Sequence, residues 1–164
     1  MKKIIITMVM MAQMGLAFGQ QTNKVSIYNT QADAQADIKT AVKQAVSEHK
    51  HVLIQVGGNW CKWCIKMDQL FHVNQTIDSL LKADYIIIHV NYSKENKNLA
   101  VLQELGFPQR FGFPVLLILD QTGKRIHTQD TGLLESGEGY DADKVIGFLK
   151  NWAPKAIDSK NYEQ

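Results

Sequence analysis

Two cysteines, spaced as C-x-x-C, carry the clearest chemistry in this sequence of 164 residues. Cys61 and Cys64 open a predicted helix, so their sulfurs lie nearly one turn apart and can form a reversible disulfide. Unpaired amides and the helix dipole at the first turn stabilise a thiolate on Cys61, and the Lys62 cation adds to this effect. We therefore expect Cys61 to be the attacking nucleophile. Cys64 lies deeper in the helix, where Trp60 and Trp63 can shield it, and it fits a resolving thiol.

A cysteine pair can also form a structural disulfide or bind a metal or haem. A disulfide that closes so short a loop removes little entropy from the unfolded chain, which argues against a purely structural bridge. Structural zinc needs four ligands, and the sequence has no second C-x-x-C and no H-x-x-x-H. Covalent haem needs a histidine directly after the second cysteine, where Ile65 stands. A copper(I) carrier that uses the same two thiolates remains open as an alternative. Apart from that alternative, we expect no metal site and no bound cofactor.

The first residues predict export. Lys2 and Lys3 precede an apolar stretch at residues 4–18, and small residues at 17 and 19 fit a cleavage site before Gln20. We expect a signal peptide over residues 1–19 and a periplasmic or secreted protein, whose cysteines meet an oxidising compartment. A membrane anchor is the alternative, although the stretch falls short of the roughly 20 residues that span a bilayer. Without this segment, 16 of the 18 basic residues remain against 16 acidic ones, so nothing indicates nucleic-acid binding.

Hydrophobic periodicity predicts the elements that must position the two cysteines. Apolar residues from Ile38 to Val46 follow the spacing of an amphipathic helix, and residues 85–90 form the apolar, β-branched run of a strand covered on both faces. We expect strands at 25–27, 51–56, 85–90, 115–119 and 124–129, helices at 31–48, 61–74, 75–82, 96–105 and 141–154, and a polar loop at 132–139. This order predicts one α/β domain with a mixed sheet over residues 20–154, followed by a flexible tail at 155–164.

Two motifs resemble the thioredoxin superfamily. The segment W-C-K-W-C at residues 60–64 follows a buried strand and opens a helix, and G-F-P at 112–114 precedes another strand. The chain resembles in particular the exported bacterial thioredoxin-like proteins with a W-C-x-W-C active site. The resemblance implies a thioredoxin fold, with a central mixed sheet of four to five strands flanked by helices. It also implies a thiol:disulfide oxidoreductase in which Cys61 attacks, Cys64 resolves, and Pro114 is cis and faces the pair.

The same resemblance bears on the surroundings of the pair. Trp60 and Phe113 are expected to line a groove for protein thiols and disulfides. We also expect an upstream redox partner and a monomer. Two features depart from cytoplasmic thioredoxins, which have Gly-Pro where this chain has residues 62–63, and a buried acid where it has Gln55. His89, on a strand expected beside Gln55, matches a lysine that approaches that acid, and we consider it as the proton acceptor for Cys64. Reductases, oxidases and isomerases share these residues, so the direction of exchange stays open.

Overall fold

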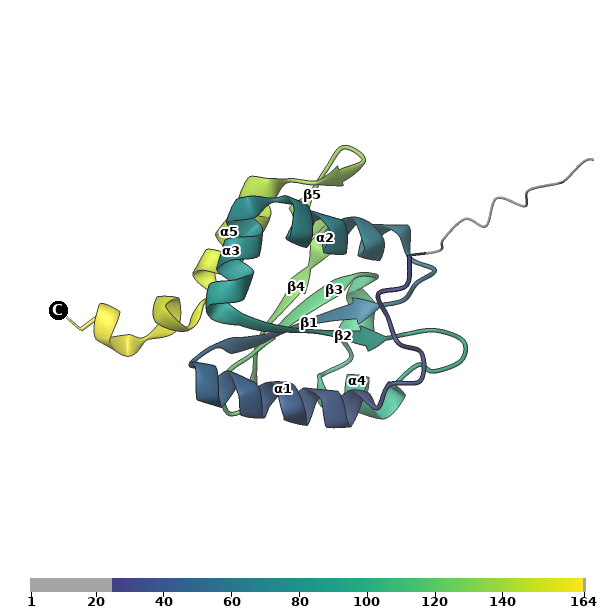
Figure 1. Cartoon of the computed structure of the whole chain (residues 1–164), viewed down its shortest axis with the longest axis horizontal. Helices are drawn as coiled ribbons and strands as arrows, with labels where there is room; N and C mark the ends of the chain where they lie inside the picture. Colours follow the sequence, from purple (N-terminus) through teal and green to yellow (C-terminus); the bar gives the residue numbers. More distant parts are fainter. Residues whose placement is uncertain (1–24, 164) are drawn as a thin grey trace, which may run out of the picture.

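The computed structural model describes residues 25–163 and centres on a mixed four-stranded sheet (Figure 1). The strands are β1 (His51–Gly57), β2 (Tyr85–Asn91), β3 (Val115–Leu119) and β4 (Arg125–Asp130). They lie in the order β2-β1-β3-β4, in which β1 and β2 are parallel and the other two pairs are antiparallel. Every residue of β1 and β3 is buried, as predicted for β1 and as the unbroken apolar run of β3 indicates. The predicted mixed sheet is confirmed.

Helices cover both faces of the sheet. They are α1 (Ala34–Glu48), α2 (Lys62–Val73), α3 (Gln75–Asp84), α4 (Leu99–Glu104) and α5 (Ala142–Asn151). Since side chains alternate along a strand, Val52, Ile54 and Val56 of β1 pack in one core with α1 and α4. Leu53 points the other way, into a second core with α2, α3 and α5. Figure 1 shows α1 and α4 below the sheet and the other three helices above it.

Capping side chains set the starts of several helices. The Asp141 carboxylate accepts hydrogen bonds from two backbone amides in the first turn of α5, as the sequence predicts. Asn74 ends α2 and caps α3, accepting from two amides of that helix. The predicted helix from residue 31 begins at Ala34 instead, because Asp33 is its N-cap. α4 is shorter than predicted, since Asn98 takes a left-handed conformation with φ 49° directly before it.

The strand predicted at residues 25–27 is wrong. This segment has no neighbour in the sheet. The Asn59 side chain bonds the backbone of this segment instead, because its oxygen accepts hydrogen bonds from the amides of Ile27 and Tyr28 at 2.9 and 3.0 Å. One side chain thereby satisfies backbone groups that a neighbouring strand would otherwise bond.

The predicted polar loop at 132–139 also contains more structure than expected. It holds a 3-10 turn at Thr131–Leu134 and a two-stranded hairpin of β5 (Glu135–Ser136) and β6 (Gly139–Tyr140). The stretch after Pro154, expected as a tail, carries two further 3-10 turns.

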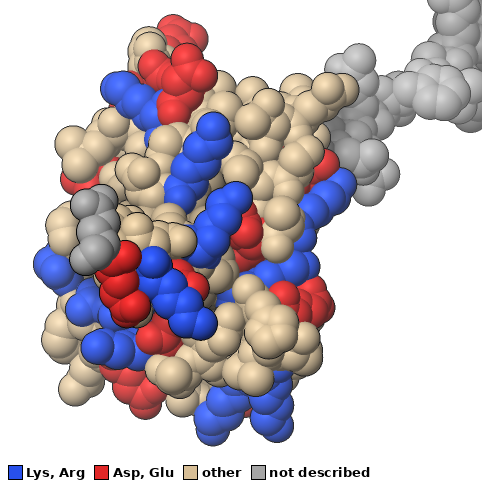
Figure 2. All heavy atoms as spheres, turned by 90° about the vertical axis from the view of Figure 1, so that its left-hand side faces the viewer, with Lys and Arg blue, Asp and Glu red and all other residues tan. Residues whose placement is uncertain are grey.

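The expected signal segment, residues 1–19, lies outside the described residues. Within residues 25–163, none of the helices combines the length and apolar character needed to cross a bilayer. Basic and acidic side chains are interspersed on the face that Figure 2 displays, in line with the nearly balanced charge of the sequence.

Candidate functional site

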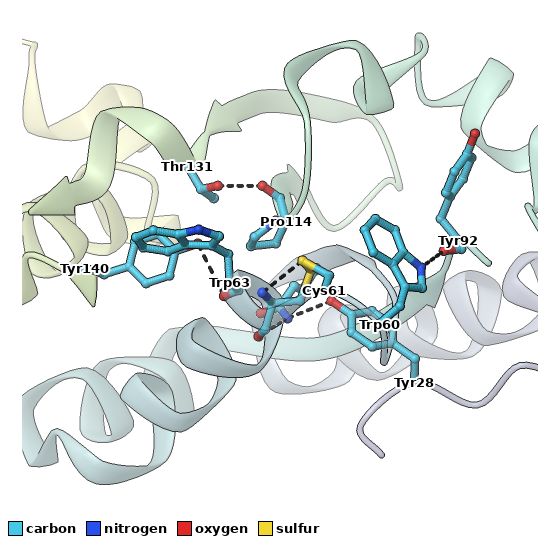
Figure 3. The surroundings of a disulfide bond; sticks show 10 residues. Tyr28, Trp60, Cys61, Trp63, Tyr92, Pro114, Thr131 and Tyr140 are labelled. Atoms are coloured by element: carbon cyan, nitrogen blue, oxygen red, sulfur yellow. Dashed lines mark hydrogen bonds between the residues drawn. A yellow bond between two sulfur atoms is a disulfide. The ribbon is translucent and has the colours of Figure 1, made fainter. Parts of the chain in front are cut away.

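Cys61 and Cys64 form a disulfide at the start of α2, where the sequence places them (Figure 3). Cys61 is the N-cap of this helix, and its Sγ accepts a hydrogen bond from the backbone amide of Cys64 at 3.1 Å. Their Cα atoms are 5.2 Å apart. Cys61 keeps 6% of its surface exposed, whereas Cys64 is fully buried. An outside disulfide can therefore reach Cys61 first, and a helix amide already points at the sulfur that would carry the charge.

A glycine at the end of β1 leaves space for the buried sulfur of Cys64. Gly57, its last residue, has no side chain, and a Cβ there would overlap with Sγ of Cys64 and lie 2.6 Å from the hydroxyl of Tyr28. Tyr28 is only 2% exposed and shares a small core cluster with the two cysteines. The expectation that Trp60 shields Cys64 is corrected here, because Tyr28 and Gly57 lie against its sulfur. Tyr28 is the functional neighbour that sequence reasoning missed.

Trp60 turns outward instead. Its side chain is 57% exposed, and its Nε1 donates a hydrogen bond to the backbone oxygen of Tyr92 at 2.7 Å. Its ring meets Phe113 edge to face at 5.5 Å, and Phe113 stacks on Tyr92 at 4.8 Å. Trp60 also lines an open groove of about 630 Å³ together with Asn59, Tyr92 and Lys94. The structure thus brings an exposed aromatic surface next to Cys61.

Pro114 is a buried residue next to the pair. Its peptide bond with Phe113 is cis, as the resemblance implies, and Figure 3 shows its ring facing the disulfide. The carbonyl of Pro114 accepts a hydrogen bond from the Thr131 hydroxyl at 2.5 Å. This contact ties the residue before β3 to the turn that follows β4.

Trp63 packs inward under the small hairpin. Its ring meets Tyr140 of β6 edge to face at 5.3 Å, and the Tyr140 hydroxyl donates to the Trp63 carbonyl at 3.3 Å. The Lys66 ammonium lies 4.7 Å from the centre of the Trp63 ring and also donates to the backbone oxygen of Glu138. Trp63 therefore joins the cluster around the cysteines. Lys62, the first residue of α2, is exposed beside them.

Gln55 occupies the position below the buried cysteine. It is fully buried, and its Nε2 donates to the Tyr28 hydroxyl at 2.7 Å and to the Cys64 carbonyl at 3.1 Å. His89 is the register partner of Gln55 on the parallel strand β2, so the predicted neighbourhood of the two residues is confirmed. Both side chains point to the face of the sheet that α2 covers.

The His89 imidazole makes its own contacts on that face. Its Nε2 lies 3.3 Å from Oδ1 of Asp68, and its ring meets the Tyr28 ring edge to face at 5.3 Å. Burial lowers the pKa of His89, and the Asp68 carboxylate opposes that effect. Tyr28 therefore contacts the His89 ring and also packs in the same core cluster as Cys64. Across residues 25–163, no group of three or more His, Cys, Asp or Glu side chains is arranged to hold a metal ion.

Comparison with known proteins agrees with this geometry. Residues 33–121 match the sequence family described as thioredoxin-like. The chain is 27% identical over 141 residues to the disulfide bond reductase DsbH of Chlamydia pneumoniae, covering 80% of each protein. It is similar to the disulphide isomerase of Xylella fastidiosa Temecula1, with 25% identity, a TM-score of 0.67, and coverage of 76% of this chain and 94% of that one.

A third relative shows the fold alone. The oxidised C-terminal domain of Neisseria meningitidis DsbD is 21% identical, with a TM-score of 0.51 over 72% of this chain and 95% of that one. Together with the observed sheet order, these similarities identify the architecture as the thioredoxin fold.

Proposed function

The chain belongs to the thioredoxin-like family and is a thiol:disulfide oxidoreductase, and we propose that it exchanges disulfides with protein partners through Cys61 and Cys64. The observation that carries this proposal is the asymmetry of the pair. Cys61 is the partly exposed sulfur that accepts a helix amide, and Cys64 is fully buried behind it. The W-C-x-W-C sequence supports a place among the exported bacterial members of the family.

The proposed reaction starts from the dithiol. The Cys61 thiolate attacks a partner disulfide, so a bond forms between Sγ of Cys61 and one partner sulfur while the other partner sulfur leaves as a thiolate and takes up a proton. Cys64, as a thiolate, then attacks Sγ of Cys61. This step forms the Cys61–Cys64 disulfide and releases the second partner thiolate, so two electrons pass from the pair to the partner. An upstream redox partner restores the dithiol by the reverse sequence.

The surface around Cys61 supports binding of an extended partner segment. The exposed Trp60 ring packs against the half-buried Phe113, and the ring of the buried Pro114 faces the disulfide. A partner segment that brings its sulfur to Cys61 therefore lies beside these residues. We propose that these three residues hold the partner, and that Lys62 adds positive charge near the thiolate.

The two named relatives suggest a direction of exchange. The relatives named above are a disulfide bond reductase and a disulphide isomerase, and both activities begin when a thiolate attacks a substrate disulfide. We therefore propose that the reduced form of this protein meets the partner. A potential of the Cys61–Cys64 pair near that of thioredoxin, about −270 mV, supports this direction, and a value near the about −120 mV of a strong oxidant contradicts it.

The role of each cysteine is tested by trapping. Cys64→Ser should accumulate a mixed disulfide with partner proteins, because nothing resolves it, whereas Cys61→Ser should trap none. Diagonal gels separate the trapped complexes. Equal trapping by both variants contradicts the assignment. If the reduced protein binds one equivalent of copper(I) and fails to reduce insulin, the carrier function is favoured instead.

Export is proposed from the sequence of residues 1–19, and domain bounds of 20–154 go with it. The intact mass of the protein recovered from the producing cells is the test. A mature chain that begins at Gln20 supports cleavage, and a chain that keeps residues 1–19 supports an anchor.

A further inference from the structure

Tyr28 is placed against the sulfur that resolves the reaction. Its hydroxyl and Sγ of Cys64 both lie within overlap distance of a Cβ added at Gly57, so the two atoms share the space that this glycine leaves free. We propose that Tyr28 is a positioning residue, whose hydroxyl donates a hydrogen bond to Sγ of Cys64 and stabilises its thiolate. This inference rests on the proposed function and names the group that supports its second step.

The direction of this hydrogen bond follows from Gln55. The Gln55 amide nitrogen lies 3.1 Å from the carbonyl oxygen of Cys64, which can only accept, so the NH₂ group must face that carbonyl. The same nitrogen lies 2.7 Å from the Tyr28 oxygen. The Tyr28 oxygen therefore accepts from Gln55, and its own proton is free for another acceptor.

The acceptor that we assign to this proton is the buried sulfur, because the hydroxyl and Sγ of Cys64 both lie within 2.6 Å of the position of a Cβ built on Gly57. A disulfide sulfur accepts hydrogen bonds only weakly, whereas a thiolate accepts them strongly because it is charged. Oxidation state therefore changes the strength of the Tyr28 contact, which favours the reduced pair. Because Tyr28 is buried and nearly inaccessible to water, the sulfur has little competition for its proton.

Burial and a nearby carboxylate keep Tyr28 a donor rather than a base. The His89 ring on β2 meets the Tyr28 ring edge to face, and Asp68 on α2 lies 3.3 Å from the His89 imidazole. Burial and the Asp68 carboxylate raise the pKa of the Tyr28 phenol, although the bond from Gln55 opposes them. Tyr28 therefore keeps its proton throughout, and the proton that the Cys64 thiol loses passes to water or to the His89 imidazole.

Asn59 holds Tyr28 in this position. Its side-chain oxygen accepts from the Tyr28 amide at 3.0 Å, and its nitrogen donates to the Tyr28 carbonyl at 2.7 Å. Asn59 stands two residues before Cys61. The loop that presents the nucleophile therefore also fixes the residue that supports the resolving cysteine.

The test compares two buried tyrosines. Tyr28→Phe removes the hydroxyl at the sulfur, and Tyr85→Phe is the matched control, because that hydroxyl is equally buried but donates to the Leu149 carbonyl in the distant core. In a Cys61→Ser background, the ¹³Cβ chemical shift of Cys64 reports its titration. Tyr28→Phe should raise the pKa of the Cys64 thiol by about one, a tenfold loss of thiolate at neutral pH, and Tyr85→Phe should leave it unchanged.

A second readout uses the intact pair. Loss of a bond that favours the dithiol makes the pair more reducing, so the equilibrium constant with glutathione should shift about tenfold in Tyr28→Phe, equivalent to about 30 mV. Asn59→Ala, which frees the Tyr28 backbone, should shift it in the same direction. Equal titration and potential in Tyr28→Phe and Tyr85→Phe overturn the inference. Failure of the wild-type protein to reduce insulin would contradict the proposed function. The Cys64 titration does not depend on that activity, so it tests the role of Tyr28 separately.

Discussion

Replacing Gly57 by alanine tests how tightly the end of β1 is packed against the redox pair. The added Cβ would overlap with Sγ of Cys64 and lie 2.6 Å from the Tyr28 hydroxyl and 3.1 Å from its ring carbon Cζ. Real Cβ atoms essentially never approach other atoms below 3.0 Å, so the sulfur or the tyrosine must move. Neither can move freely, because Cys64 is held by the disulfide and by α2, and Tyr28 by Gln55 and Asn59.

The expected size follows from this rigidity. Overpacking a filled core by one methyl group typically destabilises a protein by about 1–3 kcal/mol, and we expect the upper part of that range here. Gly147 provides the control, because it lies inside α5 and nothing lies within 4 Å of a Cβ built on it. Gly147→Ala should stabilise the protein by about 0.5–1 kcal/mol through helix propensity.

Urea unfolding of the two oxidised variants measures the difference. Gly57→Ala should lower the free energy of unfolding and slow disulfide exchange, because the groups displaced are Cys64 and Tyr28. Gly147→Ala should keep wild-type exchange. A Gly57→Ala variant within about 0.5 kcal/mol of wild type, with normal exchange, would refute the close packing of β1 against the sulfur.

Three further outcomes are expected. His89→Gln should slow the resolution of a preformed mixed disulfide at pH 7 in stopped-flow experiments. Adding Gln55→Asp to that variant should restore the rate, because it supplies a carboxylate as proton acceptor. Unchanged rates in His89→Gln from pH 6 to 8 would remove His89 from the mechanism. Burial lowers the pKa of His89 in the folded protein, so below about pH 6.5 the unfolded chain binds a proton there more readily than the folded one. The free energy of unfolding should therefore fall from pH 7 to pH 5. His89→Gln should flatten this pH dependence in urea unfolding experiments. Trp60→Ala should raise the KM for a protein substrate without moving the potential of the pair, since its ring is exposed beside Cys61; a shifted potential would contradict a binding role.

Local patterns account for most of what the sequence predicts correctly. The apolar runs of β2 and β3 and the helical spacing of α1 are periodicities that each segment carries within itself. The C-x-x-C spacing and the position of Cys61 directly before the first residue of α2 are local in the same sense. The adjacency of Gln55 and His89 follows from parallel pairing of two strongly predicted strands, so it too is recovered without a structure.

The outward turn of Trp60 could not be predicted in this way. Trp60 lies four residues before Cys64, about one helical turn away, and Trp63 lies directly before it, so the sequence allows either ring to cover the sulfur. The backbone oxygen of Tyr92, 32 residues away, sets the orientation of Trp60, because it accepts a hydrogen bond from the indole and holds the ring beside Phe113. Such a contact depends on how the loop after β2 lies against the loop after β1, and neither loop has a periodic pattern.

Tyr28 was missed for a related reason. The alternation of Val25 and Ile27 indicates a strand, and it would leave Tyr28 as the residue between a strand and a helix, with no assigned partner. In the structure one amide side chain, Asn59, replaces the sheet, and it turns Tyr28 toward the pair rather than toward solvent. An amide at position 55 in place of an acid was the available signal. A buried amide has hydrogens to donate, and the tyrosine oxygen that receives one is left with its own proton for the sulfur. The substitution that removes a base from beneath Cys64 thereby orients a hydrogen-bond donor toward it.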